Sequence, residues 1–558
     1  MQVSRKIGAW LPTLLLILLP LGIYWHSLGN GFVVWDDDTL VYKNPLVQHM
    51  SLYSIWAVFT SYDPELYIPL TFLSYQIEHA LFGLHASVFH ATNLLLHIIS
   101  TVFVYFLLQR WKLSRWVAFG AAALFALHPM NSEGVCWISA RKDMLSNTLF
   151  LGTLLAWQQY RLQGLQRRYW QAVMLFGFAL LAKVSVVLLP IVFLLIDWRD
   201  RRPIHRKSIQ ELAPFIGLSV MFILIALFGK TTNIASLTPW QTTLLATKAV
   251  VFYPMTYLLP FSLSSIYHQS TPITLASPEF ALPALCALCV AGFSLLSLRW
   301  SRIPLFCVLF FLVMLAPSFA NFSKMGSLYF ASDRYISIAQ ISLLYGLGIA
   351  WTVLARIHRQ SASIATLLLA LAVMPAFVAA SYQRSILWGD SETLFRDAMA
   401  KNPGSAVIHF NLAVVEQERG HYSEALALYD KALAIRPDFS QAYNNAGLIY
   451  KEQGDATKAE QWFLKAEELD PHNLSALINL ASVQLDRGNA DAAISLLQRA
   501  LMEDPYNVPA LSKLGAAYGK KEMYAEGLHA FQRAWKLDPI MHAQSKELEQ
   551  MLLHYNVE

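Results

Sequence analysis

Apolar residues dominate the first two thirds of the chain and then give way to an amphipathic pattern. Long apolar runs recur before about residue 380, whereas the remaining third mixes apolar and polar residues with the period of water-soluble helices. A run of about 20 apolar residues is long enough for a helix to cross a membrane. The pattern therefore predicts a membrane part over about residues 1–380, followed by a soluble helical part.

The apolar runs predict about eleven membrane spans. The first, near 9–28, follows Arg5 and Lys6 and is interpreted as a signal anchor that stays in place. The others are expected near 86–108, 116–130, 144–160, 170–182, 184–198, 210–228, 280–298, 303–318, 336–354 and 362–380. Segment 240–261 is also apolar, and we expect it to be a re-entrant or surface-lying helix.

The distribution of Lys and Arg predicts the orientation in the membrane. These residues concentrate in alternate, short connections, which places the connections and the N-terminus in the cytoplasm. The outer loops are then about 29–85, 131–143, 229–279 and 319–335. Everything after about residue 381 is expected outside.

Composition agrees with this picture and excludes other classes. The chain of 558 residues is 56% hydrophobic and 14% charged, with a mean hydropathy of +0.41, which is typical of a membrane protein rather than a soluble one. The net charge of +5 arises in the cytoplasmic connections, so no nucleic-acid partner is expected. The four cysteines form neither a disulfide framework nor a zinc motif.

The last third of the chain carries a repeat of 34 residues. The repeat is marked by prolines, by small residues and by turn glycines at Pro403, Pro437, Pro471, Pro505 and Pro539, at Ala398, Ala432, Ala466, Ala500 and Ala534, and at Gly420, Gly454 and Gly488. A 34-residue helix–turn–helix unit is the tetratricopeptide (TPR) signature. We expect a junction with half a repeat over 381–405, four repeats over 406–540, and a capping helix over 541–558. Glu522 replaces a turn glycine, so the last repeat should be less regular.

A ladder of asparagines follows the same period. Asn411, Asn445 and Asn479 lie on the first helix of successive repeats, where their amides can both donate to and accept from an extended peptide in the groove. The alternative is that these amides hydrogen-bond within the solenoid itself. Lys513 ends the ladder in the fourth repeat.

Three carboxylates, Asp36, Asp37 and Asp38, follow the first span on its outer side. Carboxylates beside the aromatic Trp35 at a membrane surface are candidates for a general base or a metal site, and the alternative is a solvated turn. A divalent cation is possible here, but the sequence does not decide it.

Further polar residues gather in the other outer loops, where charge near lipid is costly and often functional. The second outer loop holds His128, Glu133, Arg141, Lys142 and Asp143. Arginine and lysine in this loop are candidates for binding a lipid-linked phosphate, and the alternative is loop charge that flanks a span.

The remaining candidates are single residues or one helix face. Lys183 at a hairpin tip and Arg334 after Asp333 are further candidate anion ligands. His90, Asn93 and His97 share one helical face, which favours a polar stripe inside the bundle over a metal site.

These motifs in this order resemble a known family, the transmembrane and TPR-containing protein O-mannosyltransferases, of which the chain resembles a bacterial relative. The resemblance rests on Phe32–Asp37, Tyr67–Thr71, His90 with Asn93 and His97, His128 to Glu133 with Arg141–Asp143, and Ser332–Tyr335, ahead of the repeats. It implies an all-α protein, a GT-C-like transmembrane helix bundle followed by a TPR α-solenoid.

The resemblance also implies the chemistry. It implies a polyprenyl-phosphate-linked sugar as donor, a polypeptide hydroxyl as acceptor, and inversion at the sugar carbon. Asp36 and Asp37 would carry the chemistry, although Asp38 leaves open which residue is the base. The donor phosphate would be bound by Arg141, Lys183 and Arg334, with Asp38, His128, Glu133, Asp333, His90 and His97 in support.

Two alternatives remain at this stage. The acceptor can be a lipid or a glycan, with the TPR part only recruiting partners, or the chain can be a non-enzymatic assembly scaffold. The scaffold is disfavoured because the carboxylate, His-Pro and Asp-Arg-Tyr groups all occur in one chain.

Overall fold

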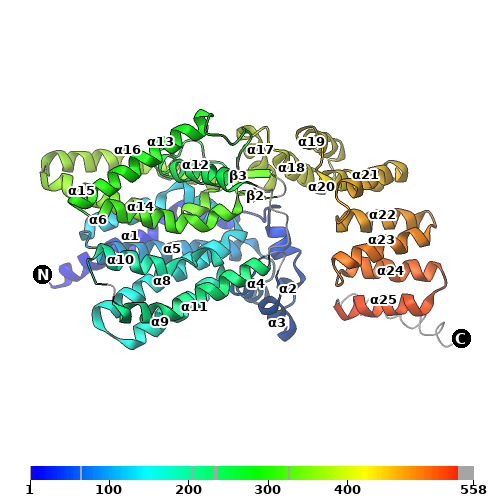
Figure 1. The fold of residues 1–558 in the computed structure, drawn as a ribbon, viewed down its shortest axis with the longest axis horizontal. Coiled ribbons are helices and arrows are strands. Elements are labelled where there is room, and N and C mark those ends of the chain that lie inside the picture. The colour runs from blue at the N-terminus through cyan, green and yellow to red at the C-terminus, as the bar shows by residue number, and fades with distance from the viewer. Residues whose placement is uncertain are drawn as a thin grey trace. The chain divides into compact units, whose positions relative to one another are not determined.

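The computed structural model describes residues 2–62, 66–203, 205–229, 237–324, 327–357 and 359–537. The chain is almost entirely helical and divides into two compact units, Met1–Asn402 and Pro403–Glu558 (Figure 1). The prediction of an all-α protein with apolar helices followed by helical repeats is confirmed. The capping helix predicted for 541–558 lies outside the described residues.

Long helices make up most of the first unit. They are α1 (Gln2–Tyr24), α2 (Pro45–Gln48), α3 (Leu52–Thr60), α4 (Pro69–Phe82), α5 (Ala86–Arg110), α6 (Arg115–Leu127), α7 (Ser132–Cys136), α8 (Arg141–Gln163), α9 (Gln166–Ala182), α10 (Leu189–Arg199), α11 (Arg206–Phe228), α12 (Pro239–Leu258), α13 (Pro278–Leu296), α14 (Ile303–Leu315), α15 (Gln340–Ile357), α16 (Arg359–Leu387) and α17 (Ser391–Lys401).

Short helical turns and a small sheet connect these helices. The turns are η1 (Trp25–Gly29), η2 (Asp38–Tyr42), η3 (Pro129–Asn131), η4 (Ile138–Ala140), η5 (Val184–Val186), η6 (Ser297–Arg299), η7 (Ala316–Asn321) and η8 (Asp333–Ile336). The antiparallel sheet contains β1 (Tyr267–His268), β2 (Ser323–Lys324) and β3 (Ser327–Ala331), with β3 in the middle.

The core of the first unit lies between α1, α5, α6, α8 and α9. Helix α8 packs against both α5 and α9, and α1 packs against α5 and α6. Aromatic rings fill the α8–α10 region, where Trp157 stacks on Phe193 with ring centroids 4.4 Å apart. The packing of α8 on α5 and α9 fixes this helix, and the candidate site is built around its first turn.

Six helical segments among the described residues are long and apolar enough to cross a membrane. They are Trp10–Gly29, Ala86–Arg110, Arg206–Phe228, Pro278–Arg299, Ile303–Asn321 and Gln340–Ile357. Each coincides with a predicted span. The other five predicted spans fall on α6, on α8, on α9, on η5 with α10, and on α16, outside this set of six, so the count of eleven is not confirmed. The apolar helices indicate a multi-pass membrane protein.

The second unit consists of helix pairs. They are α18 (Ala406–Glu418) with α19 (Tyr422–Ile435), α20 (Ser440–Glu452) with α21 (Ala456–Leu469), α22 (Leu474–Asp486) with α23 (Ala490–Glu503), and α24 (Val508–Lys520) with α25 (Tyr524–Leu537).

The turns inside the pairs explain the repeat signature. Gly420, Gly454 and Gly488 adopt φ angles of +78°, +81° and +83°, a left-handed conformation in which a glycine avoids strain. Glu522 occupies the same turn of the last repeat with a φ of +60°. The backbone geometry of the turn is therefore kept in the fourth repeat, without the residue that adopts it most easily.

Candidate active site

Asp37 is a buried carboxylate that holds two loops together. Its Oδ2 accepts a hydrogen bond from the Val33 amide at 2.9 Å, and its Oδ1 accepts from the amide and the hydroxyl of Ser139 at 2.9 and 2.5 Å. Burial raises the pKa of Asp37 to about 6, although these hydrogen bonds oppose the rise. Asp37 thus joins the loop after η1 to η4 through Oδ1, while Oδ2 accepts a hydrogen bond from its own loop.

Asp36 lies beside a cation. Its Oδ2 is 3.2 Å from Nζ of Lys142, in the first turn of α8, and its side chain is 22% exposed. The same Nζ lies 5.1 Å from the centroid of the Trp137 ring. Burial lowers the pKa of Lys142, and the negative charge of Asp36 opposes that shift. Asp36 is therefore more accessible than fully buried Asp37, and it is paired with a positive charge.

Two further cations approach the start of α8. Nζ of Lys183, in the link between α9 and η5, lies 2.6 Å from Oδ1 of Asp143. Arg334 in η8 forms an ion pair with Glu133, and its Nε lies 3.9 Å from Oδ2 of Asp143. The guanidinium of Arg334 also lies 5.0 Å from the centroid of the Trp137 ring. Burial lowers the pKa of Lys183, and the carboxylate of Asp143 opposes this shift.

These six charged side chains form one outer-loop charge cluster, which we define as Asp36, Glu133, Lys142, Asp143, Lys183 and Arg334. Three buried polar atoms in it have no hydrogen-bond partner among the described residues, namely Glu133 Oε2, Asp143 Oδ2 and Arg334 Nε, and Nε1 of the adjacent Trp137 has none there either. Buried polar atoms are otherwise almost always paired. The cluster is therefore suited to hold a polar or charged ligand.

Arg141 does not fit the predicted role of a phosphate ligand. Its Nε donates to Asn93 at 2.5 Å, Nη1 donates to Ser74 and Glu78 at 3.2 and 2.7 Å, and Nη2 donates to Glu78 and to the Phe89 carbonyl at 3.2 and 2.8 Å. These contacts use all five donors of a guanidinium. The side chain is fully buried, so Arg141 links α4, α5 and α8.

The polar face of α5 supports the loops of the site. Asn93 Nδ2 donates to the Trp137 carbonyl at 2.8 Å, so it fixes the backbone next to the charge cluster. His90 Nε2 lies 3.3 Å from the Gly31 carbonyl, and His97 Nε2 lies 3.2 Å from the Ala126 carbonyl. These three contacts agree with the interpretation as a bundle-facing stripe.

His128 is likewise bound to its surroundings. Its Nε2 lies 2.8 Å from the Tyr257 carbonyl, its Nδ1 accepts from the Met130 amide at 3.2 Å, and its ring stacks on Tyr257 with centroids 3.8 Å apart. His128 thus connects η3 to the end of α12. No direct contact between His128 and the charge cluster is recorded among the described residues.

Asp333 forms a second buried charged group, together with Arg384 of α16. Oδ1 of Asp333 accepts from the Tyr267 hydroxyl at 2.7 Å, and its Oδ2 lies 3.6 Å from Nη2 of Arg384. Burial raises the pKa of Asp333 to about 7, while Arg384 lowers it and Glu133 raises it further. Arg384 was not among the residues predicted from the sequence. Its position as a lone arginine just after the last apolar run could have indicated a buried ion pair.

The three adjacent aspartates do not converge as metal ligands. Among the described residues, the group of three ligand side chains with mutually close ligand atoms is Glu416, His421 and Glu424, in the second unit. Asp37 is engaged with Ser139. The observed contacts therefore give no support to a divalent cation at Asp36, Asp37 and Asp38.

The asparagine ladder is partly tied into the solenoid. Asn479 Nδ2 donates to Asn444 Oδ1 at 2.9 Å, and Asn444 Nδ2 donates to Asn445 Oδ1 at 3.1 Å. Asn411 is half-buried on α18. Lys513, at the next position of the ladder, donates to the Ser482 hydroxyl at 3.2 Å. Some hydrogen-bonding capacity of Asn445 and Asn479 is therefore used internally.

Comparison with known families identifies the second unit. A family model described as "Tetratricopeptide repeat" matches residues 382–438 and 410–473, and a second model of the same description matches 450–518. The C-terminal part of the chain is a TPR domain. Among solved structures, "YrrB: a TPR protein with an unusual peptide-binding site" is 26% identical, covers 29% of this chain and 83% of that chain, and has a TM-score of 0.26.

Curated relatives confirm the resemblance to the transmembrane and TPR-containing O-mannosyltransferases. "Protein O-mannosyl-transferase F38B6.6" of Caenorhabditis elegans is 23% identical over 455 residues, which cover 74% of this chain and 61% of the relative. "Protein O-mannosyl-transferase TMTC1" of Mus musculus is 33% identical over 152 residues, which cover 25% of this chain and 16% of the relative. The chain thus spans less than two thirds of the length of each of these relatives.

Proposed function

We propose that this chain is a membrane glycosyltransferase. It transfers a sugar, a hexose such as mannose, from a polyprenyl-phosphate carrier to Ser or Thr hydroxyls of extracytoplasmic polypeptides. We place it in a bacterial inner membrane with the N-terminus in the cytoplasm and the TPR domain outside. The observation that carries the proposal is the outer-loop charge cluster, which sets one partly exposed carboxylate beside three cations.

Asp36 is the general base in this proposal. Its side chain is partly exposed, whereas Asp37 is fully buried and holds Ser139 and Val33. A carboxylate that must receive a substrate proton needs access to the substrate. Asp37 is therefore a positioning residue, which keeps the loop that carries Asp36 against η4.

Lys142, Lys183 and Arg334 bind the donor phosphate in this proposal. Lys142 takes the place that the sequence analysis gave to Arg141, because Arg141 has no donor left for a ligand. Cations at the leaving phosphate stabilise the charge that develops as the glycosidic bond breaks. When a phosphate binds Lys142, it competes with Asp36 for that ammonium and so releases the carboxylate to act as a base.

The reaction is a single displacement. The acceptor hydroxyl gives its proton to Asp36 and its oxygen forms a bond to the anomeric carbon. The bond between that carbon and the phosphate oxygen breaks, and the polyprenyl phosphate leaves with the electron pair. Attack opposite to the leaving group inverts the configuration of the sugar carbon.

The TPR domain recruits the polypeptide acceptor in this proposal. TPR solenoids expose an extended concave surface that suits a peptide, and the relatives are named protein O-mannosyltransferases. Asn411, together with the remaining hydrogen-bonding capacity of Asn445 and Asn479, would contact the peptide backbone.

The test is a transfer assay with membranes that contain the chain. Polyprenyl-phosphate hexoses are offered together with a peptide pool, and glycosylated peptides are detected by mass spectrometry. Sugar on peptides supports the proposal. Sugar found only on lipid or glycan acceptors indicates the alternative in which the TPR domain recruits partners. Absence of transfer to any of these acceptors indicates the scaffold.

A further inference from the structure

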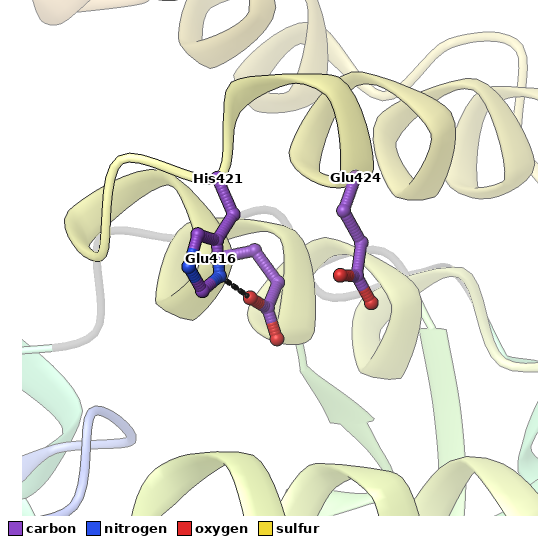
Figure 2. Close-up of side chains that lie close together, drawn as sticks. All are labelled: Glu416, His421 and Glu424. Carbon is purple, nitrogen blue, oxygen red and sulfur yellow. Dashed lines mark hydrogen bonds and ion pairs between the residues drawn. The ribbon is translucent and has the colours of Figure 1, made fainter.

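The turn between α18 and α19 brings three metal-ligating side chains together. Glu416 lies on α18, and its side chain is only 1% exposed, whereas His421 and Glu424 lie at the surface at the start of α19. Their ligand atoms all lie within 4.8 Å of one another, and His421 Nδ1 is 2.8 Å from Glu416 Oε2. Figure 2 shows the imidazole and both carboxylates on one side of this turn.

The other repeats do not place three ligands at this turn. The corresponding positions hold Tyr450, Asp455 and Lys458 in the second repeat, Gln484, Asn489 and Ala492 in the third, and Tyr518, Met523 and Glu526 in the fourth. The turn itself is common to the domain, so these differences do not follow from the needs of the fold. The first repeat alone carries one imidazole and two carboxylates at these positions.

The second and third repeats show how this turn is otherwise filled. Lys458 Nζ lies 3.4 Å from the Asp455 carboxylate, so the second repeat has a cation of its own at the turn. In the third repeat, Asn489 Nδ2 donates to Gln484 Oε1 at 2.9 Å, which is a neutral pair. In the first repeat the residue that corresponds to Lys458 is Glu424, which reverses the charge at that place.

We propose that Glu416, His421 and Glu424 bind a divalent transition-metal cation, with Zn²⁺ as the best match. An imidazole nitrogen with carboxylate oxygens is a ligand set for Zn²⁺ and its neighbours, whereas Ca²⁺ and Mg²⁺ prefer oxygen alone. Ligand bonds of about 2.0–2.2 Å place ligand atoms roughly 3–4 Å apart, which small rotations of the exposed His421 and Glu424 side chains can reach. The bound cation would join α18 to α19 and stabilise the first repeat.

The test measures metal bound by the full chain purified in detergent. After removal of metal with a chelator, the protein is dialysed against Zn²⁺, and bound zinc is counted by mass spectrometry. Glu424→Gln is the decisive variant because it keeps the hydrogen bond between Glu416 and His421. We expect wild type to retain one equivalent, and Glu424→Gln and His421→Ala to bind at least about 10-fold more weakly.

A second histidine–carboxylate pair in the same domain supplies the matched control. His472 Nδ1 lies 2.7 Å from Glu503 Oε1, so a pair alone can be compared with the triad. His472→Ala should keep the zinc equivalent. Zinc should also slow hydrogen exchange of the amides between α18 and α19 in wild type and in His472→Ala, but not in Glu424→Gln. Equal zinc binding in wild type and Glu424→Gln, or no zinc in wild type, would show that Glu416 and His421 form only a turn hydrogen bond. Loss of zinc in His472→Ala would place the bound zinc at His472 and would also overturn the proposal.

Discussion

Nζ of Lys142 lies 3.2 Å from Oδ2 of Asp36, so the first turn of α8 holds the first outer loop by an ion pair. The side chain of Lys142 is 5% exposed, and that of Asp36 is 22% exposed. A ligand can therefore reach the carboxylate more readily than the ammonium. An anionic ligand that binds Lys142 must share the ammonium with Asp36. Donor binding should therefore weaken the ion pair that engages the proposed base.

Replacing Lys142 by Met should weaken donor binding. The change keeps an unbranched side chain one atom shorter and removes its charge, and a hydrogen bond to a charged group contributes about 1.5–3 kcal/mol. We expect the half-saturating concentration of the polyprenyl-phosphate donor to rise roughly 10-fold or more in initial-rate measurements. Lys207→Met, at an exposed lysine at the start of α11, is the control and should leave it unchanged. An unchanged donor requirement in the Lys142 variant would remove Lys142 from the donor site.

The buried carboxylate of Asp37 should make stability depend on pH. Its pKa is raised to about 6 from 3.8, so the folded state holds the proton more tightly than the unfolded state. The free energy of unfolding should therefore fall as the pH rises from about 4 to about 6, and then stay level. Ser139→Ala removes a hydrogen bond to the charged form, so it should lower the melting temperature more at pH 7 than at pH 4. Equal losses at both pH values would contradict this assignment.

Replacing two asparagines of the ladder should have different effects, one on stability and one on transfer. Asn479→Ala removes the donor to Asn444, so it should destabilise the domain by about 1 kcal/mol. Asn411→Ala should leave the melting temperature unchanged and lower transfer to long, unfolded acceptors, while short peptides are still glycosylated. Thermal melts and transfer assays of both variants distinguish the structural role of Asn479 from the peptide contact of Asn411. Normal transfer of long acceptors by the Asn411 variant would argue against peptide contact at that position.

Glu522→Gly should stabilise the last repeat. Glu522 has a φ of +60°. This left-handed conformation costs a residue with a side chain about 1–2 kcal/mol of stability. Glycine avoids that cost, but the gain is only partial because glycine loses more conformational entropy on folding. We expect a gain of roughly 0.5–1 kcal/mol, seen as slower hydrogen exchange in α24 and α25 of the full chain. Gly454→Ala introduces a side chain at the same turn of the second repeat, so it should have the opposite effect and speed exchange in α20 and α21. Faster exchange in Glu522→Gly would be inconsistent with strain at this turn.

Local patterns predicted the second unit well. The 34-residue spacing places equivalent residues at equivalent points of each repeat, so the turn at Gly420 and the strained turn at Glu522 could both be derived from the sequence. The six spans that are long and apolar enough to cross a membrane were also predictable, because length and composition are local properties. The predicted spans on α8 and α9 do not fall within the six, because α8 carries charged residues in its first and last turns and α9 has only 17 residues.

The candidate site was harder to predict, because the roles of its residues depend on distant partners. Arg141 was expected to bind phosphate, yet its partners Glu78 and Asn93 lie 63 and 48 residues away in the sequence and use its donors. The neighbouring Lys142 belongs to the same motif but faces Asp36. Three-dimensional contacts alone distinguish the accessible Asp36 from the buried Asp37, which are adjacent in the chain.

The most direct test of the central claim is transfer by the purified protein in proteoliposomes. Wild type is compared with Asp36→Asn and with Asp200→Asn, a matched acid whose ion pair with Arg199 lies outside the charge cluster. The proposal predicts that wild type and Asp200→Asn add a hexose from the polyprenyl-phosphate donor to the peptide, while Asp36→Asn is slower by at least about 10²-fold without reduced membrane insertion. Hexose transfer by Asp36→Asn at the wild-type rate would contradict it.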